Sequence, residues 1–356
     1  MARRLRRHLN SSNLQAILKP GVFPLNVRGF LRFFAHLQLL PVLESGEETT
    51  LVGGQAVMEG VMMRSPHSYC VAVRKPDGGI VTEESELPRL SDKYRIFKLP
   101  VVRGLGTLGQ AMWLGMKALR FSANALLEAG AEQSDDKKTS GPKEMKGWMM
   151  WGNIAFSLVF FLFLYKFVPL YLATWLGHQV PEAGSRFAIN MTDGVIRIVL
   201  FLGFLWLISR MKDIQRVFEY HGAEHKVVFN FESGQPVTVE NAQRFVTWHP
   251  RCGTSFLLVV MVLAMIVYAL LPFDSFAVKL IARIALLPLI VGLSYELIRF
   301  AARHQKGLMA MLTQPGLWLQ RITTQPPSND QAEIAICALE RAMALEAAQG
   351  GELVIA

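Results

Sequence analysis

Long apolar runs occupy the chain from about residue 148 to residue 312. Four of them approach the roughly 20 residues that a helix needs to cross a bilayer core. They lie at about 152–176, 194–210, 254–272 and 277–301. The second run is short, and we expect Arg197 to extend its charge toward the interface. The pattern predicts a membrane domain of four transmembrane helices.

A different pattern, with alternation and glycine, precedes the apolar runs between residues 51 and 131. Two alternating stretches at 70–74 and 80–82 flank the turn sequence PDGG at 76–79. Proline presets φ and glycine supplies a positive φ, so this pattern predicts a β-hairpin. Residues 104–127 then place apolar side chains at helical spacing, which predicts an amphipathic helix. We expect this region to lie outside the bilayer, in the cytosol.

Three further segments complete the predicted organisation. Residues 1–50 form a basic, amphipathic segment in which 28–43 are apolar but too short to span, so we expect an interfacial helix there. Residues 132–147 form a polar linker, and 313–356 form a cytosolic tail with an Ala/Leu/Glu-rich helix. The predicted fold class is therefore a mostly α, polytopic membrane protein with a small β-containing N-terminal region and amphipathic helices.

Composition and charge agree with a membrane location. Of the 356 residues, 51% are hydrophobic and only 18% are charged, which is too apolar for an ordinary soluble protein of this size. The net charge of +9 does not indicate nucleic acid, because Lys and Arg flank the apolar runs without an aromatic-interleaved basic groove. Cys70, Cys252 and Cys337 are odd in number and far apart, which favours reduced thiols over disulfides.

The distribution of basic residues between the runs predicts an orientation. The connection at 177–193 holds one basic residue and that at 273–276 holds none, whereas 210–253 holds six. By the positive-inside rule, both termini and the 211–253 loop lie on the cytosolic side of a bacterial inner membrane. The lipid bilayer is the expected partner; protein partners are not predicted.

A histidine pair in that loop is the strongest candidate for chemistry. His221 and His225 fall at i and i+4 on one helical face, with Glu224 between them in the order H-x-x-E-H. His249 and Cys252 follow as H-x-x-C. Imidazole and thiolate are zinc ligands, so the spacing predicts a divalent metal site, with zinc as the expected ion.

Three interpretations of this group stay open. In a catalytic site, His221 and His225 share the metal with one more ligand, which is His249, Cys252 or Glu296, and Glu224 is the general base. In a structural site, both pairs close a four-ligand shell. In the third interpretation these are interfacial histidines with ordinary hydrogen-bond partners.

Two other features bear on the site. Ile214, Val217, Phe218 and the histidine pair keep one helical face, so we expect the second transmembrane helix to continue past Arg210. The glycine- and methionine-rich stretch at 53–64 is either one glycine-bent strand packed by methionines or a substrate-binding loop. In the second case Glu59 and Arg64 are substrate contacts, and Glu296, at the cytosolic end of the fourth run, is a further candidate.

Four stretches also carry a family resemblance: GGQAVMEGVMMR at 53–64, VRG at 102–104, YHGAEHK at 220–226 and HPRCGTSF at 249–256. In these the chain resembles the YqhQ-like family, DUF1385, of uncharacterised bacterial membrane proteins, over roughly residues 50–340. The resemblance implies a membrane protein and a metal-dependent enzyme of unknown substrate.

We therefore expect a membrane-embedded zinc enzyme that performs metal-assisted hydrolysis at the cytosolic face. A peptide or lipid-linked substrate is indicated by location alone, and no nucleic acid is expected. The alternative is a non-catalytic membrane scaffold or transport component with a structural zinc site.

Overall fold

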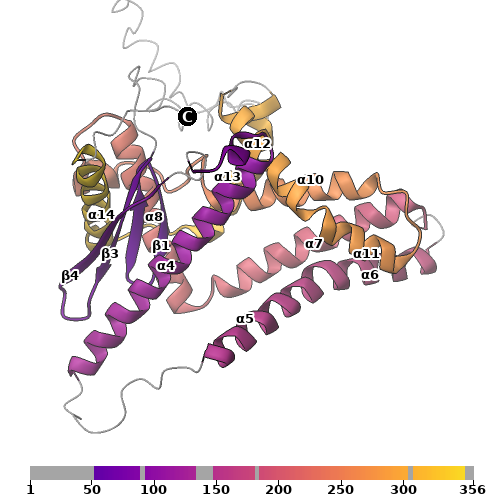
Figure 1. The fold of residues 1–356 in the computed structure, drawn as a ribbon, viewed down its shortest axis with the longest axis horizontal. Coiled ribbons are helices and arrows are strands. Elements are labelled where there is room, and N and C mark those ends of the chain that lie inside the picture. Colours follow the sequence, from indigo (N-terminus) through magenta and orange to yellow (C-terminus); the bar gives the residue numbers. More distant parts are fainter. Residues whose placement is uncertain (1–51, 89–92, 134–146, 181–183, 304–307, 349–356) are drawn as a thin grey trace, which may run out of the picture. The chain divides into compact units, whose positions relative to one another are not determined.

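The computed structural model describes residues 52–88, 93–133, 147–180, 184–303 and 308–348, which are mostly helical with a small N-terminal β-sheet (Figure 1). The predicted basic segment at 1–50 lies outside these residues, as does most of the linker at 132–147. Helix α4 (Val102–Gln133) ends close to the predicted start of the linker, and α5 (Gly147–Leu162) begins at its predicted end.

Four antiparallel strands form the sheet in the order β1-β2-β3-β4. The hairpin of β3 (Ser68–Arg74) and β4 (Ile80–Glu86) confirms the predicted turn, which Gly78 makes with φ +88°. The stretch at 53–64 is a second hairpin, of β1 (Gly53–Val57) and β2 (Gly60–Arg64), so the expectation of one bent strand was wrong. Its turn holds Glu59 at φ 52°. Glycine is the residue expected at a positive φ, so the glutamate gives no sequence signal for a turn.

Helices cover both faces of the sheet, which places the sheet in the interior. Met62 and Val71 point to one face and pack with Leu114 and Ala118 of α4. On the other face, α8 (Lys212–Glu232) and α14 (Asn329–Ala348) pack against Val61 and neighbouring strand residues (Figure 1). The predicted amphipathic helix at 104–127 therefore exists within α4, and its buried stripe covers a sheet.

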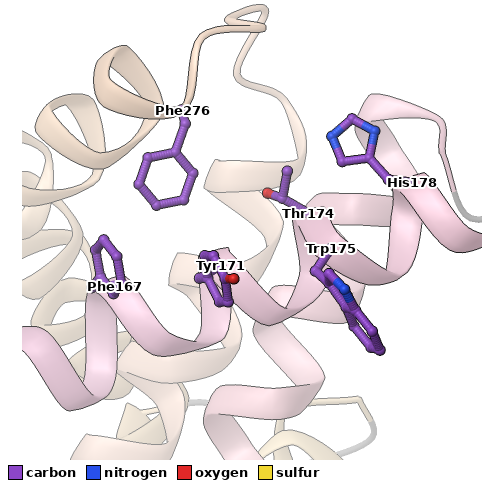
Figure 2. Close-up of a pocket in the computed structure, with 6 residues that line it drawn as sticks. All are labelled: Phe167, Tyr171, Thr174, Trp175, His178 and Phe276. Atoms are coloured by element: carbon purple, nitrogen blue, oxygen red, sulfur yellow. The ribbon is translucent and has the colours of Figure 1, made fainter.

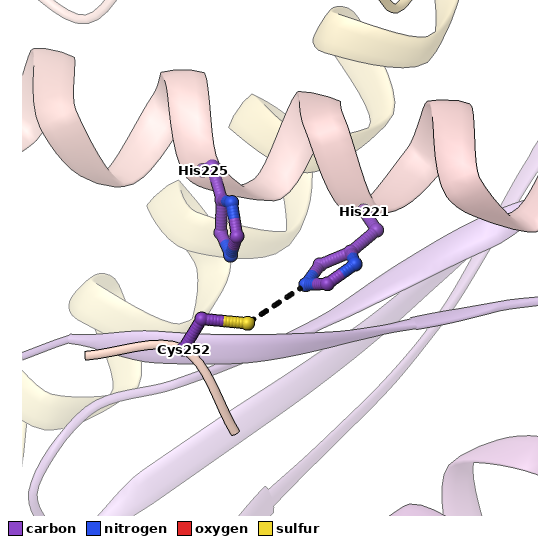
Figure 3. A group of neighbouring side chains, drawn as sticks. All are labelled: His221, His225 and Cys252. Atoms are coloured by element: carbon purple, nitrogen blue, oxygen red, sulfur yellow. Dashed lines mark hydrogen bonds between the residues drawn. The ribbon is translucent and has the colours of Figure 1, made fainter. Parts of the chain in front are cut away.

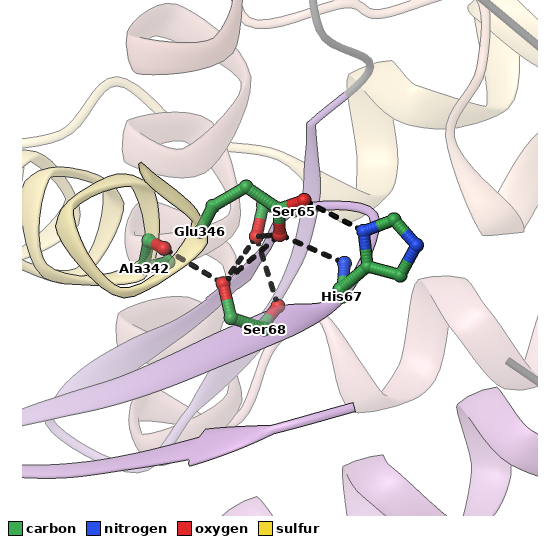
Figure 4. Close-up of polar contacts among 5 residues, drawn as sticks. All are labelled: Ser65, His67, Ser68, Ala342 and Glu346. Carbon is green, nitrogen blue, oxygen red and sulfur yellow. Dashed lines mark hydrogen bonds and ion pairs between the residues drawn. The ribbon is translucent and has the colours of Figure 1, made fainter. Parts of the chain in front are cut away.

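A polar cluster fixes α14, the predicted C-terminal helix, to the turn between β2 and β3 (Figure 4). The Glu346 carboxylate accepts hydrogen bonds from the Ser65 hydroxyl at 2.7 Å and the His67 N–H at 2.8 Å, and contacts His67 Nδ1 at 2.7 Å. Ser68 donates to the Ala342 carbonyl at 2.7 Å. Neither serine contacts the His67 ring in these bonds, so the cluster is a clasp and lacks the relay of a catalytic triad.

Two stretches in the described residues are long and apolar enough to cross a membrane. The first, Ala155–Gln179, comprises most of α5, the π-helical turn η3 (Phe163–Phe167) and α6 (Val168–Gln179). The second is α7 (Arg186–Ile208), which begins eight residues earlier than expected. Each of these two stretches contains most of the corresponding apolar run that the sequence predicted to span the membrane.

The other two predicted spans take different forms. Helices α11 (Phe276–Ala285) and α12 (Leu287–Arg303) are bent by 47° and count as a third span only if the pair is taken as one. Helix α10 (Gly253–Ala269) is apolar but has 17 residues. The described residues thus offer two or three candidate spans, and the expected number of four is not confirmed.

The α7 helix stops before the histidine pair, so the expectation of one continuous helix past Arg210 was wrong. The Ser209 hydroxyl bonds back to the Trp206 carbonyl at 2.7 Å, and Met211 is extended at φ −77°, ψ 130°. Asp213 lies in the first turn of α8, where a negative charge favours a helix start. The break lets α8 leave the axis of α7 and lie against the sheet.

Short elements connect these parts: η2 (Arg95–Lys98) before α4 and α9 (Val239–Gln243) after α8. Helix α13 (Leu308–Thr323) packs against α10 and leads into α14. The ends of α8, α10 and α13 contribute the polar groups described next.

Candidate metal centre

His221 and His225 of α8 meet Cys252, the residue that precedes α10 (Figure 3). One ligand atom from each lies within 4.8 Å of the other two. His221 Nε2 is 3.2 Å from the Cys252 sulfur, and the two imidazole centroids are 4.4 Å apart. The structure thus brings together three of the four predicted ligands, across 31 residues of sequence.

Backbone carbonyls orient both imidazoles. The Thr323 carbonyl lies 2.7 Å from His221 Nδ1, and the Thr247 carbonyl hydrogen-bonds His225 Nδ1. A carbonyl can only accept, so in each neutral ring Nδ1 carries the proton and Nε2 keeps its lone pair. Histidines that bind metals usually have such a partner on the other nitrogen. Thr247 and Thr323 were not anticipated, because a carbonyl carries no signal in the residue type.

The pKa values of His225 and Cys252 are shifted in the directions that favour metal binding. Burial lowers the pKa of His225 to about 4, helped by the positive field of His221. Burial alone raises the pKa of the Cys252 thiol, but the hydrogen bond and charge of His225 and the hydrogen bonds of Thr254 outweigh burial, so this pKa is lowered. A neutral imidazole and a thiolate are the forms that coordinate metal ions.

His249, the fourth predicted ligand, lies next to this group with other partners. Its Nδ1 accepts the Arg251 N–H at 3.3 Å, and its Nε2 lies 3.5 Å from the Glu232 carboxylate, which also pairs with Arg251. The centroids of the His249 and His225 rings are 5.6 Å apart. Burial lowers the pKa of His249 to about 4. In this arrangement His249 braces the turn that carries Cys252.

Two residues that support this turn were missed at the sequence level. Gln320 of α13 accepts the His249 N–H at 2.6 Å and donates to the His249 carbonyl at 2.8 Å. Glu232 lies seven residues after His225 on the same face of α8. Helical spacing would have identified Glu232, but nothing in the chain connects Gln320 with the H-x-x-C segment.

Glu224 reaches the same region from α8. Its side chain is only 7% exposed, and burial raises the pKa of its carboxyl to about 7, against the lowering effect of His221. The Gly54 N–H of β1 hydrogen-bonds this carboxylate. A Cβ on Gly54 would lie 2.9 Å from Glu224 Cγ and 2.6 Å from the Met62 carbonyl, so only glycine allows this approach.

Of the three predicted substrate contacts, Arg64 is the one beside Glu224. Arg64 is partly exposed as a residue; burial of its guanidinium lowers its pKa, and the charges of Tyr295 and Glu224 oppose this. Glu59 instead pairs with Arg216 and accepts from the Tyr220 hydroxyl at 3.2 Å.

Glu296 is likewise engaged elsewhere. It pairs with Arg103, whose Nε donates at 2.6 Å, and accepts the Val101 N–H at 3.2 Å. It is not one of the three residues in the metal-ligand group of the described chain. Its contacts join α12 to the start of α4.

Two comparisons with known proteins identify the family of this chain. A profile described as "Protein of unknown function (DUF1385)" matches residues 99–345, about two thirds of the chain. The chain belongs to the DUF1385 family. It is 36% identical over 304 residues to the Uncharacterized protein YqhQ of Bacillus subtilis (strain 168), covering 83% of this chain and 93% of that protein. No solved structure matches.

The part matched by the DUF1385 profile contains the histidine pair, Cys252, His249 and both orienting carbonyls. The β-sheet that supplies Gly54 and Arg64 precedes it. The family name carries no reaction, so the function has to be argued from the site.

Proposed function

We propose that this DUF1385 protein is a membrane-embedded, zinc-dependent hydrolase. The observation that carries the proposal is the convergence of His221, His225 and Cys252, with both imidazoles oriented by carbonyls and a buried carboxyl alongside. His221, His225 and Cys252 would hold the ion. The other predicted ligands, His249 and Glu296, have the partners described above.

The donor set fits zinc in type and spacing. Bonds of about 2.0–2.3 Å in a tetrahedral shell separate ligand atoms by about 3.5 Å. The three side chains hold their ligand atoms within 4.8 Å, so small rotations suffice to reach that separation. Three protein ligands are typical of catalytic zinc sites, whereas structural sites use four.

Zinc supplies Lewis-acid chemistry, in which it polarises a substrate carbonyl or phosphoryl oxygen and activates water. Glu224, with a carboxyl pKa of about 7, can accept a proton near neutral pH and return it to a leaving group. The Gly54 N–H holds this carboxylate in place. Arg64 favours a substrate that presents a negative charge near Glu224.

A location in the bacterial inner membrane, with both termini cytosolic, is part of the same proposal. Its support is the pair of long apolar helices, the bent third pair, and the bias of basic residues toward 210–253. Large apolar side chains such as Phe156, Val199 and Ile281 are exposed on these helices. A peptide or lipid-linked substrate would reach the centre from the bilayer edge.

Burial favours a second candidate function, a non-catalytic scaffold or transport component with a structural zinc site. His225, Glu224 and His249 are all buried, and the Glu232–Arg251 pair ties the cysteine turn to α8. In that function a rotated His249 would complete a four-ligand shell.

Metal analysis of the full-length protein in detergent tests the shared premise. We expect about one zinc per chain, lost in His221→Ala, His225→Ala and Cys252→Ala, and retained in the matched control His178→Ala. A protein without zinc, or with zinc unaffected by the three substitutions, contradicts both functions.

Cobalt substitution separates the two functions without a known substrate. A small hydroxamate should change the visible spectrum of the cobalt protein if a coordination position is available to ligands, as the hydrolase requires. His249→Gln should leave that spectrum largely unchanged. An inert spectrum, strongly altered by His249→Gln, would support the structural alternative instead. Glu224→Gln should keep the metal and shift the pH dependence of the spectrum.

A further inference from the structure

A group of buried cations lies within the apolar helices, apart from the metal ligands. Lys166 of η3, Arg197 of α7 and Arg283 of α11 surround the Tyr268 ring of α10, at 5.2, 5.3 and 5.2 Å from its centroid. Each of the three is at most 8% exposed. The π-helical turn at 163–167 places Lys166 inside, and such turns often occur at functional sites.

One carboxylate faces these cations among the residues that the structure describes. Asp193 contacts Arg197 Nη2 at 2.7 Å and Arg283 Nη1 at 2.9 Å. Both arginines stay protonated in proteins. The group therefore holds one unbalanced positive charge from the arginines, and two when Lys166 is protonated.

Buried donors in the group also lack acceptors. In the described chain, Arg283 Nε, Arg197 Nη1 and Asn190 Nδ2 have no hydrogen-bond partner. Among the described residues, Arg283 Nη1 and Asp193 Oδ1 also lack a hydrogen bond, although they form an ion pair at 2.9 Å. Arg283 Nη2 donates to the Asn190 side-chain oxygen at 2.6 Å, and Arg197 Nε donates to the Tyr165 carbonyl at 3.0 Å. Unpaired charged donors in an apolar interior are costly, and an anion would supply both the charge and the acceptors.

The Tyr268 ring offsets part of this charge through cation–π contacts. Its hydroxyl donates to the Arg283 carbonyl at 2.8 Å and lies 3.2 Å from Lys166 Nζ. A π face cannot satisfy the free N–H groups of two guanidinium forks, whose geometry suits a carboxylate or phosphate. The ligand that fits these donors is therefore an oxyanion.

A hollow lies between α6 and the beginning of α11, the helix that carries Arg283 (Figure 2). The hollow is about 390 Å³ and includes Phe167, Tyr171 and Phe276 in its lining. Phe276 of this lining, Lys279 and Arg283 fall at i, i+3 and i+7, so they share one face of α11. Lys279 is only 5% exposed.

We propose that Lys166, Arg197, Arg283 and Asn190 form a binding site for a single oxyanion, a phosphate or carboxylate, within the apolar helices. The site is independent of the metal centre. Its ligand comes either from a lipid headgroup or from a soluble anion, since both present the same chemistry to the arginines.

The test uses full-length protein in a neutral detergent at constant ionic strength. Thermal unfolding is followed with increasing inorganic phosphate, phosphatidylglycerol or phosphatidylcholine. If the bound anion is a lipid headgroup, we expect saturable stabilisation by phosphatidylglycerol alone. If it is a soluble anion, we expect inorganic phosphate to stabilise the protein as well. Stabilisation by neither, or equally by phosphatidylcholine, overturns the proposal.

Variants then assign the effect to the cluster. Arg197→Gln and Lys166→Gln should each weaken anion binding about tenfold or more, since a charged hydrogen bond contributes about 1.5–3 kcal/mol. Arg186→Gln is the matched control, because Arg186 lies on α7 and pairs with the exposed Asp274. Unchanged affinity in both cluster variants contradicts the site.

Asp193→Asn distinguishes binding from a purely structural network. Removing the carboxylate that competes for both arginines should tighten anion binding and leave the zinc content unchanged. A network that serves only stability would instead lose stability in this variant without any gain in affinity, which would count against the proposal even if Arg283→Gln fails to fold.

Discussion

Two glycines that are adjacent in the sequence face different surroundings. A Cβ on Gly54 would meet Met62, Met63 and Glu224 within 3 Å, whereas one on Gly53 would find its nearest neighbour, Arg64 Nε, at 4.0 Å. The absence of one methyl group therefore sets how closely the sheet approaches the carboxyl of Glu224.

We predict that Gly54→Ala displaces Glu224 and destabilises the protein by about 1–3 kcal/mol, the usual range for an overpacked core. Gly53→Ala is the control and should unfold like the wild type. Thermal unfolding of both variants, with zinc content measured in parallel, checks the prediction. Equal melting temperatures for the two variants would show that β1 does not contact the helix as described.

The buried histidines make the metal-free protein sensitive to acid. His225 and His249 have folded-state pKa values of about 4, against about 6.5 in an unfolded chain, so between these values the unfolded state binds more protons. Glu224 acts in the opposite sense between about 4.5 and 7, because its pKa is raised. Net stability should fall as pH drops from about 6.5 to 4, by about 1.4 kcal/mol per pH unit.

Unfolding measurements on metal-free variants show how much each of these groups contributes to the pH dependence of stability. Glu224→Gln removes the opposing proton and should steepen the loss about twofold, whereas His249→Gln should nearly abolish it. An unchanged slope in both variants would show that these groups titrate as they do in an unfolded chain.

At the scale of elements, the clasp at Glu346 holds α14 on the sheet. Burial raises the pKa of this carboxyl, but the hydrogen bonds from Ser65 and His67 together outweigh burial, so the pKa is lowered. The clasp therefore contributes stability above the unfolded pKa of about 4.5 and loses it as pH falls through the folded value.

Glu346→Gln should cost about 1–3 kcal/mol by leaving buried donors without a charged acceptor. The loss should be local, seen as faster hydrogen exchange across α14 with little change in α10. Glu340→Gln, an exposed position on the same helix, is the control. Faster hydrogen exchange across α14 in the Glu340→Gln control, or no acceleration in Glu346→Gln, would contradict the clasp.

The break at 209–211 resolves a geometric conflict in the sequence. A straight helix from Ser209 would carry His221 roughly 18 Å along its axis, away from the H-x-x-C segment at the start of the next apolar run. Because the chain turns at Met211, α8 runs along the sheet and brings its histidines to Cys252.

Across the whole molecule, the features that sequence could predict are local ones. The i, i+4 histidines, the PDGG hairpin and the C-terminal helix depend on neighbours along the chain, and the structure contains all three. The carbonyls of Thr247 and Thr323, the engagement of Glu59 by Arg216 and the grouping of cations around Tyr268 depend on contacts between distant segments. No spacing rule reports such contacts.

The position of α14 against the sheet has a consequence for synthesis of the chain. About 240 residues separate the end of β4 from the start of α14, and ribosomes add about 5–20 residues per second. The part of the sheet face that α14 covers thus stays uncovered for on the order of 10–50 s, while α8 and the apolar helices are being made. Chaperones could bind this nascent face during that time, and His221 receives the Thr323 carbonyl only near the end of translation.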